Sequence, residues 1–171
     1  MQADGVPAFD PAEIVRTLQE HGVRFVVIGG MAALAHGSPF PTEDIDITPE
    51  ASETNLDRLS AALRDLGARI RSDAVAEGSP VGHDAASLAP AGMWNLTTRA
   101  GDLDISVVPA GTQGYADLVR DAVEVEAFGL VIPIASLADV IRSKQAANRP
   151  KDQRVLPTLR EVLARRHDQT P

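Results

Sequence analysis

One segment, RFVVIGGMAALAHGSPFPTEDIDIT, constrains the fold more than any other part of the chain. It opens with a β-branched run of strand length that ends at Gly29 and Gly30, and a short apolar helix is expected next. The end of the segment alternates polar and apolar side chains, as a half-buried strand does. Asp44 and Asp46 therefore share one face of that strand, where their carboxylates repel each other unless a cation lies between them.

Helix and strand patterns in the rest of the chain predict an α+β fold, in which helices flank a mixed sheet. Residues 73–92 are rich in Ala, Gly, Pro and Ser and show little periodicity, so a long loop is expected there. We expect a core over residues 1–135 and a short C-terminal helical segment over residues 136–171 that completes the active site. Helices are predicted at residues 11–21, 31–36, 52–66 and 113–121, from 136 and from 150, and β-hairpins at 93–108 and 123–134.

Charge and composition exclude several classes of protein. The 171 residues carry a formal net charge of −8, which argues against a surface coated with basic residues for nucleic acid. The chain contains no cysteine, so disulfides and thiolate metal sites are excluded. No apolar stretch is long enough to span a membrane and the N-terminus lacks the pattern of a secretory signal, so a cytoplasmic protein is expected. Half of the sixteen Lys and Arg residues fall between Arg142 and Arg166, either as a solvated helix end or as a wall that faces phosphates.

Three carboxylates and a glycine pair form the candidate site. Asp44 and Asp46 can hold one divalent cation or two close together, and Mg²⁺ prefers such oxygen ligands. In the strand GDLDIS the apolar residues face one way and Asp104 faces the other, so a third carboxylate is available. Gly29 and Gly30 allow the backbone to approach a phosphate at the start of a helix. Each feature alone is common in tight turns and exposed strands, and their combination carries the prediction.

This combination of Gly-Gly after a strand, Asp-x-Asp about a dozen residues later and a distant third acid resembles the polymerase-beta-like nucleotidyltransferase superfamily. The resemblance implies the mixed sheet and flanking helices of that fold. It also implies that Gly29 and Gly30 hold the triphosphate of an NTP and that Asp44 and Asp46 bind two Mg²⁺ ions. Asp104 would complete the metal site and help activate the acceptor hydroxyl.

The C-terminal stretch DVIRSKQAANRPKDQRVLPTL is similar to a Lys, Arg and Asp signature of the AbiEii-like branch of that superfamily. This branch holds toxins of toxin–antitoxin pairs and phage-defence systems. The similarity implies that Lys144 contacts the triphosphate and that Arg149 and Asp152 complete the catalytic site. Thr42 keeps the Ser or Thr that many relatives have two residues before the first aspartate, whereas Phe40 stands where they have an arginine.

The resemblance leads to a functional hypothesis with two alternatives. The first is a Mg²⁺-dependent toxin that transfers a nucleotide from an NTP to RNA, with the tRNA 3′ end as the preferred acceptor and a cognate antitoxin as a partner. The second is an antibiotic nucleotidyltransferase that modifies an aminoglycoside or lincosamide hydroxyl. The third belongs to another class, a non-catalytic protein that binds a nucleotide or another protein.

Overall fold

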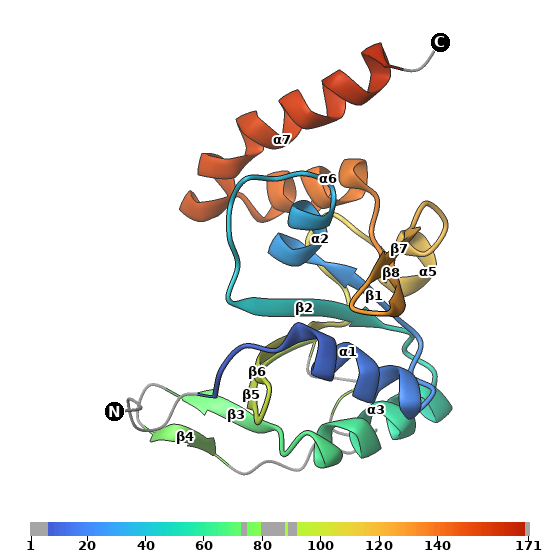
Figure 1. Cartoon of the computed structure of the whole chain (residues 1–171), viewed down its shortest axis with the longest axis vertical. Helices are drawn as coiled ribbons and strands as arrows, with labels where there is room; N and C mark the ends of the chain where they lie inside the picture. The colour runs from blue at the N-terminus through green and yellow to red at the C-terminus, as the bar shows by residue number, and fades with distance from the viewer. Residues whose placement is uncertain (1–6, 73–74, 80–87, 89–91, 170–171) are drawn as a thin grey trace.

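A computed structural model describes residues 7–72, 75–79, 88 and 92–169 of the chain. The described residues form one mixed sheet with the strand order β4-β3-β5-β6-β2-β1-β8-β7 (Figure 1). Its strands are β1 (Phe25–Ile28), β2 (Asp44–Pro49), β3 (Arg69–Ser72), β4 (Val75–Ser79), β5 (Met93–Thr98), β6 (Gly101–Ser106), β7 (Val123–Ala127) and β8 (Leu130–Ile134). The helices are α1 (Pro11–Glu20), α2 (Gly29–Ala35), α3 (Glu53–Asp65), α5 (Tyr115–Leu118), α6 (Leu137–Ala147) and α7 (Pro150–Asp168). The predicted α+β architecture with a C-terminal helical segment is confirmed.

The helices form two groups around the sheet. Figure 1 shows α1 beside α3 on one side of β2, and α2, α6 and α7 together on the other. The first group buries apolar side chains such as Leu18 and Leu59 in the main core, which also contains Ile45 and Ile47 of β2. The apolar residues of β2 thus face the core, and its aspartates face the opposite side.

The pairing of β2 brings distant residues together. It runs antiparallel to β1, where Asp46 lies opposite Ile28, and parallel to β6, where Asp46 lies opposite Asp104. Residues opposite each other on neighbouring strands point to the same face of a sheet. The same register places Asp44 opposite Asp102, so the polar faces of the two strands form one continuous acidic surface.

Two predicted elements were wrong in part. Residues 75–79 form β4 and lie within the stretch expected to be a loop, and much of the remaining stretch lies outside the described residues. The strand β3 before it was also not predicted, because its four residues are stabilised by pairing with β5, far along the chain. The helix predicted at residues 113–121 is limited to α5, which follows Gly114 at a positive φ of 85°. No described helix has the length and apolar character needed to cross a membrane.

Candidate active site

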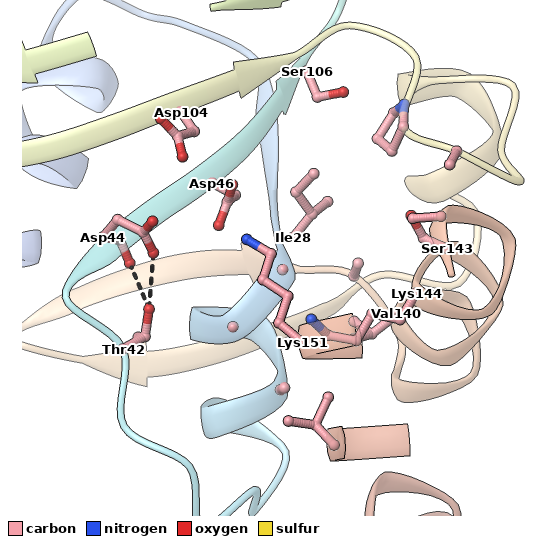
Figure 2. A pocket seen from close by; sticks show the side chains of 18 of the residues that line it. Ile28, Thr42, Asp44, Asp46, Asp104, Ser106, Val140, Ser143, Lys144 and Lys151 are labelled. Carbon is pink, nitrogen blue, oxygen red and sulfur yellow. Dashed lines mark hydrogen bonds between the residues drawn. The ribbon is translucent and has the colours of Figure 1, made fainter. Parts of the chain in front are cut away.

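A cleft of about 640 Å³ opens on the polar side of the sheet, between β1, β2 and β6, the helix α2 and the junction of α6 and α7 (Figure 2). Segments from both ends of the chain therefore meet at this cleft. Asp152, which was predicted to be catalytic, does not line it. The other predicted site residues do, and they are Gly29, Gly30, Thr42, Asp44, Asp46, Asp104, Lys144 and Arg149.

The three predicted metal ligands lie on two neighbouring strands. Asp44 and Asp46 come from β2, and Asp104 comes from β6 directly opposite Asp46. Figure 2 shows the three carboxylates on the same side of these strands. The predicted convergence of the three acids in one cleft agrees with this arrangement, and their role as metal ligands stays a prediction.

Mutual repulsion and burial act together on Asp46. Burial raises its pKa to about 7, with further contributions from the charges of Asp44 and Asp104, and nearby Lys151 and Lys144 oppose the shift. Burial also raises the pKa of Asp104, although the adjacent guanidinium of Arg71 partly offsets this effect. Burial is the largest cause of both shifts, and the neighbouring carboxylates add to it.

The residues around the first aspartate pair fix its position. The Thr42 hydroxyl lies 2.9 Å from Oδ1 of Asp44 and donates a hydrogen bond to it. Gly29 has a positive φ of 66°, and a Cβ atom at this position would lie 2.5 Å from Oδ2 of Asp46. The space taken by the Asp46 carboxylate thus requires glycine at position 29. A Cβ on Gly30 would lie 3.2 Å from Oγ1 of Thr42, so the second glycine also makes room for the site.

Arg71 is a site residue that the sequence analysis missed. Its side chain reaches from β3 to β6 and pairs with Asp102 at 2.8 Å and with Asp104 at 2.7 Å. The guanidinium therefore holds the carboxylate of Asp104, the third acid of the cleft, and also balances the charge of the neighbouring Asp102. The alternation of Arg69, Ile70 and Arg71 is a weak signal for a strand. It does not indicate that the Arg71 side chain contacts β6.

The C-terminal signature forms one buried network. Asp152 is fully buried and accepts hydrogen bonds from Nε of Arg149 at 2.7 Å and from the Arg149 backbone N–H at 3.1 Å. Nζ of Lys144 lies 3.6 Å from the same carboxylate. Burial alone would raise the pKa of Asp152, but the bonds from Arg149 and the charge of Lys144 outweigh it and hold the pKa below its usual value. Asp152 is thus placed to position the two cations.

The donor set fits Mg²⁺ chemically, because carboxylate oxygens are its usual protein ligands. Among the described residues, no three His, Asp or Glu side chains are gathered closely enough to form a complete metal cage. Asp104 pairs with Arg71, whereas neither Asp44 nor Asp46 forms an ion pair with a described residue. One or two protein carboxylates together with substrate phosphates are the common arrangement for Mg²⁺.

Comparisons by sequence give no assignment: no protein-family model and no curated protein matches the chain. Comparison with solved structures, in contrast, finds proteins that are similar to this chain. The chain resembles the lincosamide antibiotic adenylyltransferase LnuA in its lincomycin-bound form, with a TM-score of 0.61 and 16% identity, over 93% of this chain and 99% of that one.

The antibiotic-resistance factor ANT(2″)-Ia resembles the chain in two structures. The solution structure gives a TM-score of 0.53 at 16% identity, over 92% of this chain and 91% of that one. The complex with adenylyl-2″-tobramycin gives 0.51 at 16% identity, over 92% of this chain and 96% of that one. These likenesses extend over nearly the whole of each chain. The protein therefore has the polymerase-beta-like nucleotidyltransferase fold.

Proposed function

We propose that this protein is a Mg²⁺-dependent nucleotidyltransferase, which transfers the nucleotidyl group of an NTP to a hydroxyl acceptor and releases pyrophosphate. One observation carries the proposal. Asp46 and Asp104 lie opposite each other on parallel strands, with Asp44 beside them, in a cleft that also contains both lysines of the chain. A group of acids facing a group of cations is suited to a metal-bound polyphosphate.

Each side chain has a defined task in this proposal. Asp44 and Asp46 would hold Mg²⁺, which stabilises the attacking and leaving oxygens in such transfers. Asp104 lies opposite Asp46 on β6 and would take the proton of the attacking hydroxyl. Gly29 and Gly30 would bring backbone close to the triphosphate, and Lys144 and Arg149 would balance its charge.

An RNA acceptor, with the tRNA 3′ end preferred, follows from the similarity to the toxin branch and from the basic C-terminal stretch. The positive charge that this stretch can offer to an RNA is smaller than the sequence suggested, because part of it is already paired within the protein. Five of the eight basic residues already have partners within the described chain, and they are Arg142, Lys144, Arg149, Arg165 and Arg166. The proposal of an RNA acceptor therefore depends on the remaining cations and on contacts around the cleft.

A small-molecule hydroxyl is the second candidate acceptor. The structural likeness to LnuA, seen with lincomycin, and to ANT(2″)-Ia, seen with adenylyl-2″-tobramycin, supports it. The cleft of about 640 Å³ is within the usual size range for a small-molecule site.

One experiment tests the activity and separates the acceptors. The purified protein is incubated with Mg²⁺ and each of the four α-labelled NTPs, together with total tRNA, a lincosamide or an aminoglycoside. We expect label in one acceptor class with wild type and a loss of at least about 100-fold with Asp46→Ala. Expression in cells gives a second readout, because a toxin arrests growth whereas a resistance enzyme protects against the drug.

The result also decides against the non-catalytic alternative. Nucleotide binding that persists unchanged in Asp46→Ala, with no labelling of any acceptor, would identify a binding protein and overturn the proposal. An antitoxin partner is implied only if growth arrest is observed.

A further inference from the structure

The strand β7 forms one edge of the sheet, and among the described strands it pairs with β8 alone (Figure 1). An edge strand presents a row of unpaired backbone N–H and C=O groups, which can pair with a strand from another chain. No residue of β7 lines the cleft that holds the candidate active site. The edge is therefore a second surface of the molecule, and the proposed function does not use it.

The turn between β7 and β8 determines which backbone groups of β7 are free. Its two residues, Phe128 and Gly129, both have a positive φ, of 57° and 72°. In a two-residue turn of this kind the flanking residues exchange both backbone hydrogen bonds, and bonded and free residues then alternate along each strand. Every second residue of β7 therefore bonds to β8. The two residues between them, Glu124 and Glu126, direct their backbone N–H and C=O groups toward the free edge.

The side chains of β7 give the two faces of this edge opposite characters. Glu124 and Glu126 lie on one face, both exposed, and neither forms an ion pair with any residue in the described part of the chain. Val123, Val125 and Ala127 lie on the other face, and Val123 is 41% exposed. A strand that pairs with β7 thus meets two carboxylates on one face and apolar side chains on the other.

The tip of the same hairpin exposes an aromatic ring. Phe128 is 60% exposed and is not part of the hydrophobic core, although a bulky residue rarely adopts the positive φ that it has here. A hollow of about 400 Å³, lined by residues 126–131, lies beside the ring. Packing within the protein therefore does not account for an aromatic residue at this turn, whereas contact with a partner does.

A second copy of the chain is a poor partner for this edge. Only Glu124 and Glu126 have free backbone groups, so two β7 strands in antiparallel pairing would place glutamates of the two copies directly opposite each other. Like charges in opposite positions on paired strands are destabilising, and opposite charges are stabilising. Charge complementarity therefore selects a basic segment of a different protein.

We propose that β7 binds an extended segment of another protein in which basic and apolar residues alternate, and that this segment joins the sheet as an additional strand. Backbone hydrogen bonds to Glu124 and Glu126 supply the affinity, as in other cases of strand addition. The basic side chains of the segment pair with the two glutamates, and its apolar side chains pack beside Val123 and Val125. The ring of Phe128 covers one end of the segment. This inference does not depend on nucleotidyl transfer.

Hydrogen exchange followed by NMR, with and without the peptide Thr-Lys-Val-Lys-Val-Lys-Thr, tests strand addition on the whole chain. We expect the peptide to slow exchange of the Glu124 and Glu126 amides by at least about 10-fold. The amides of Val125 and Ala127 already bond to β8 and should change little. The matched control is the same peptide methylated at the backbone nitrogens of its lysines, which keeps the charge but cannot donate to β7, and it should give no protection.

Charge reversal tests the selection of a basic segment. The double variant Glu124→Lys with Glu126→Lys should bind the lysine peptide at least about 10-fold more weakly and should instead bind Thr-Glu-Val-Glu-Val-Glu-Thr. Glu53→Lys with Asp57→Lys makes the same change of net charge at exposed positions of α3 and should behave as the wild type does. Because both glutamates of β7 are exposed, the double variant is expected to keep the thermal unfolding midpoint of the wild type.

Three results would overturn the inference. Equal protection by the methylated and unmethylated peptides would mean charge attraction without strand addition. Absence of protection at about 1 mM lysine peptide would mean that the edge binds no such segment. A wild-type protein that sediments as a dimer, with the Glu124 and Glu126 amides already protected, would identify a second copy as the occupant. Each of these results leaves the labelling test of nucleotidyl transfer unaffected, so the two proposals stand or fall separately.

Discussion

Gly29 lies where the backbone and a site carboxylate compete for the same space. Replacement by alanine would place a Cβ atom 2.5 Å from Oδ2 of Asp46 and would also strain a φ of 66°. Strain of this kind costs about 1–2 kcal/mol in a left-handed conformation. The added Cβ atom would also displace the Asp46 carboxylate, which backbone strain alone would not do.

The first prediction is that Gly29→Ala lowers both stability and nucleotidyl transfer, with activity reduced at least about 10-fold. Gly67→Ala is the matched control, because Gly67 has a similar φ of 61° and no atom within 4 Å of its added Cβ. Chemical denaturation and the labelling assay compare the two variants. Equal activity in both variants at equal stability would show that contact with Asp46 is unimportant.

Asp152 gives the second prediction. Its carboxylate is fully buried between Arg149 and Lys144, so removal of its charge leaves two cations without their partner. We expect Asp152→Asn to reduce the free energy of unfolding by about 3 kcal/mol, within the range for broken buried pairs. Urea denaturation measures this loss, and Asp57→Asn on the exposed surface of α3 serves as the control. A loss below about 0.5 kcal/mol would contradict a structural role.

At the scale of single residues, the sequence predicted side chains that follow from local alternation. Asp44, Asp46 and Asp104 could be placed on strand faces because Ile and Leu neighbours mark the opposite face. Lys151 could not be assigned, because its direction depends on the left-handed Asn148 between α6 and α7. Asn148 followed by Pro150 fits the pattern of a helix C-terminus, but that pattern does not give the direction in which α7 leaves.

At the scale of elements, the short strand β3 determines what surrounds the third acid. It carries Arg71, whose guanidinium holds both Asp102 and Asp104 on β6. The four residues of β3 are too few for a clear periodic pattern, and their partner β5 lies far along the chain. Elements with longer patterns and caps, such as α1 with Asp10 and Glu13, were predicted closely.

The third prediction concerns this pairing. Arg71→Ala removes the cation that competes for the Asp104 carboxylate, so we expect the affinity for a divalent cation to rise several-fold. Paramagnetic resonance of added Mn²⁺ measures free and bound ion directly. Arg24→Ala, which breaks a surface pair with Glu50, is the control and should not change Mn²⁺ binding. Weaker binding in Arg71→Ala would mean that the arginine organises the carboxylates instead of competing for them.

At the scale of the whole molecule, α7 connects the C-terminal segment to the centre of the fold. Arg166 lies near its end and donates to Nδ1 of His36 at 2.9 Å, while Nε2 of His36 lies 2.7 Å from the carbonyl oxygen of Ala135. His36 is therefore neutral, with Nε2 as its donor. The division of the chain into residues 1–135 and 136–171 stays a prediction, although this contact crosses that boundary.

The fourth prediction is a pH dependence of stability. Burial lowers the pKa of His36, the hydrogen bond to Ala135 opposes this, and the charge of Arg166 lowers the pKa further. The unfolded chain thus binds the proton first, so the full contribution is present above about pH 6.5 and declines as the pH falls below it. Urea midpoints between pH 8 and pH 5 should fall less in His36→Gln than in wild type. His167→Gln, at an exposed position, should keep the wild-type slope.

The parallel pairing of β2 with β6 has a consequence for how activity arises during folding. Asp46 and Asp104 are separated by most of the central chain, and only this pairing makes them neighbours. Joining such distant strands is a slow and entropically costly step. A half-folded molecule is therefore expected to lack nucleotidyl transfer, which would appear only when β2 and β6 have paired and Asp104 lies beside Asp46. The time course of regained activity during refolding would then report when this pairing of strands forms.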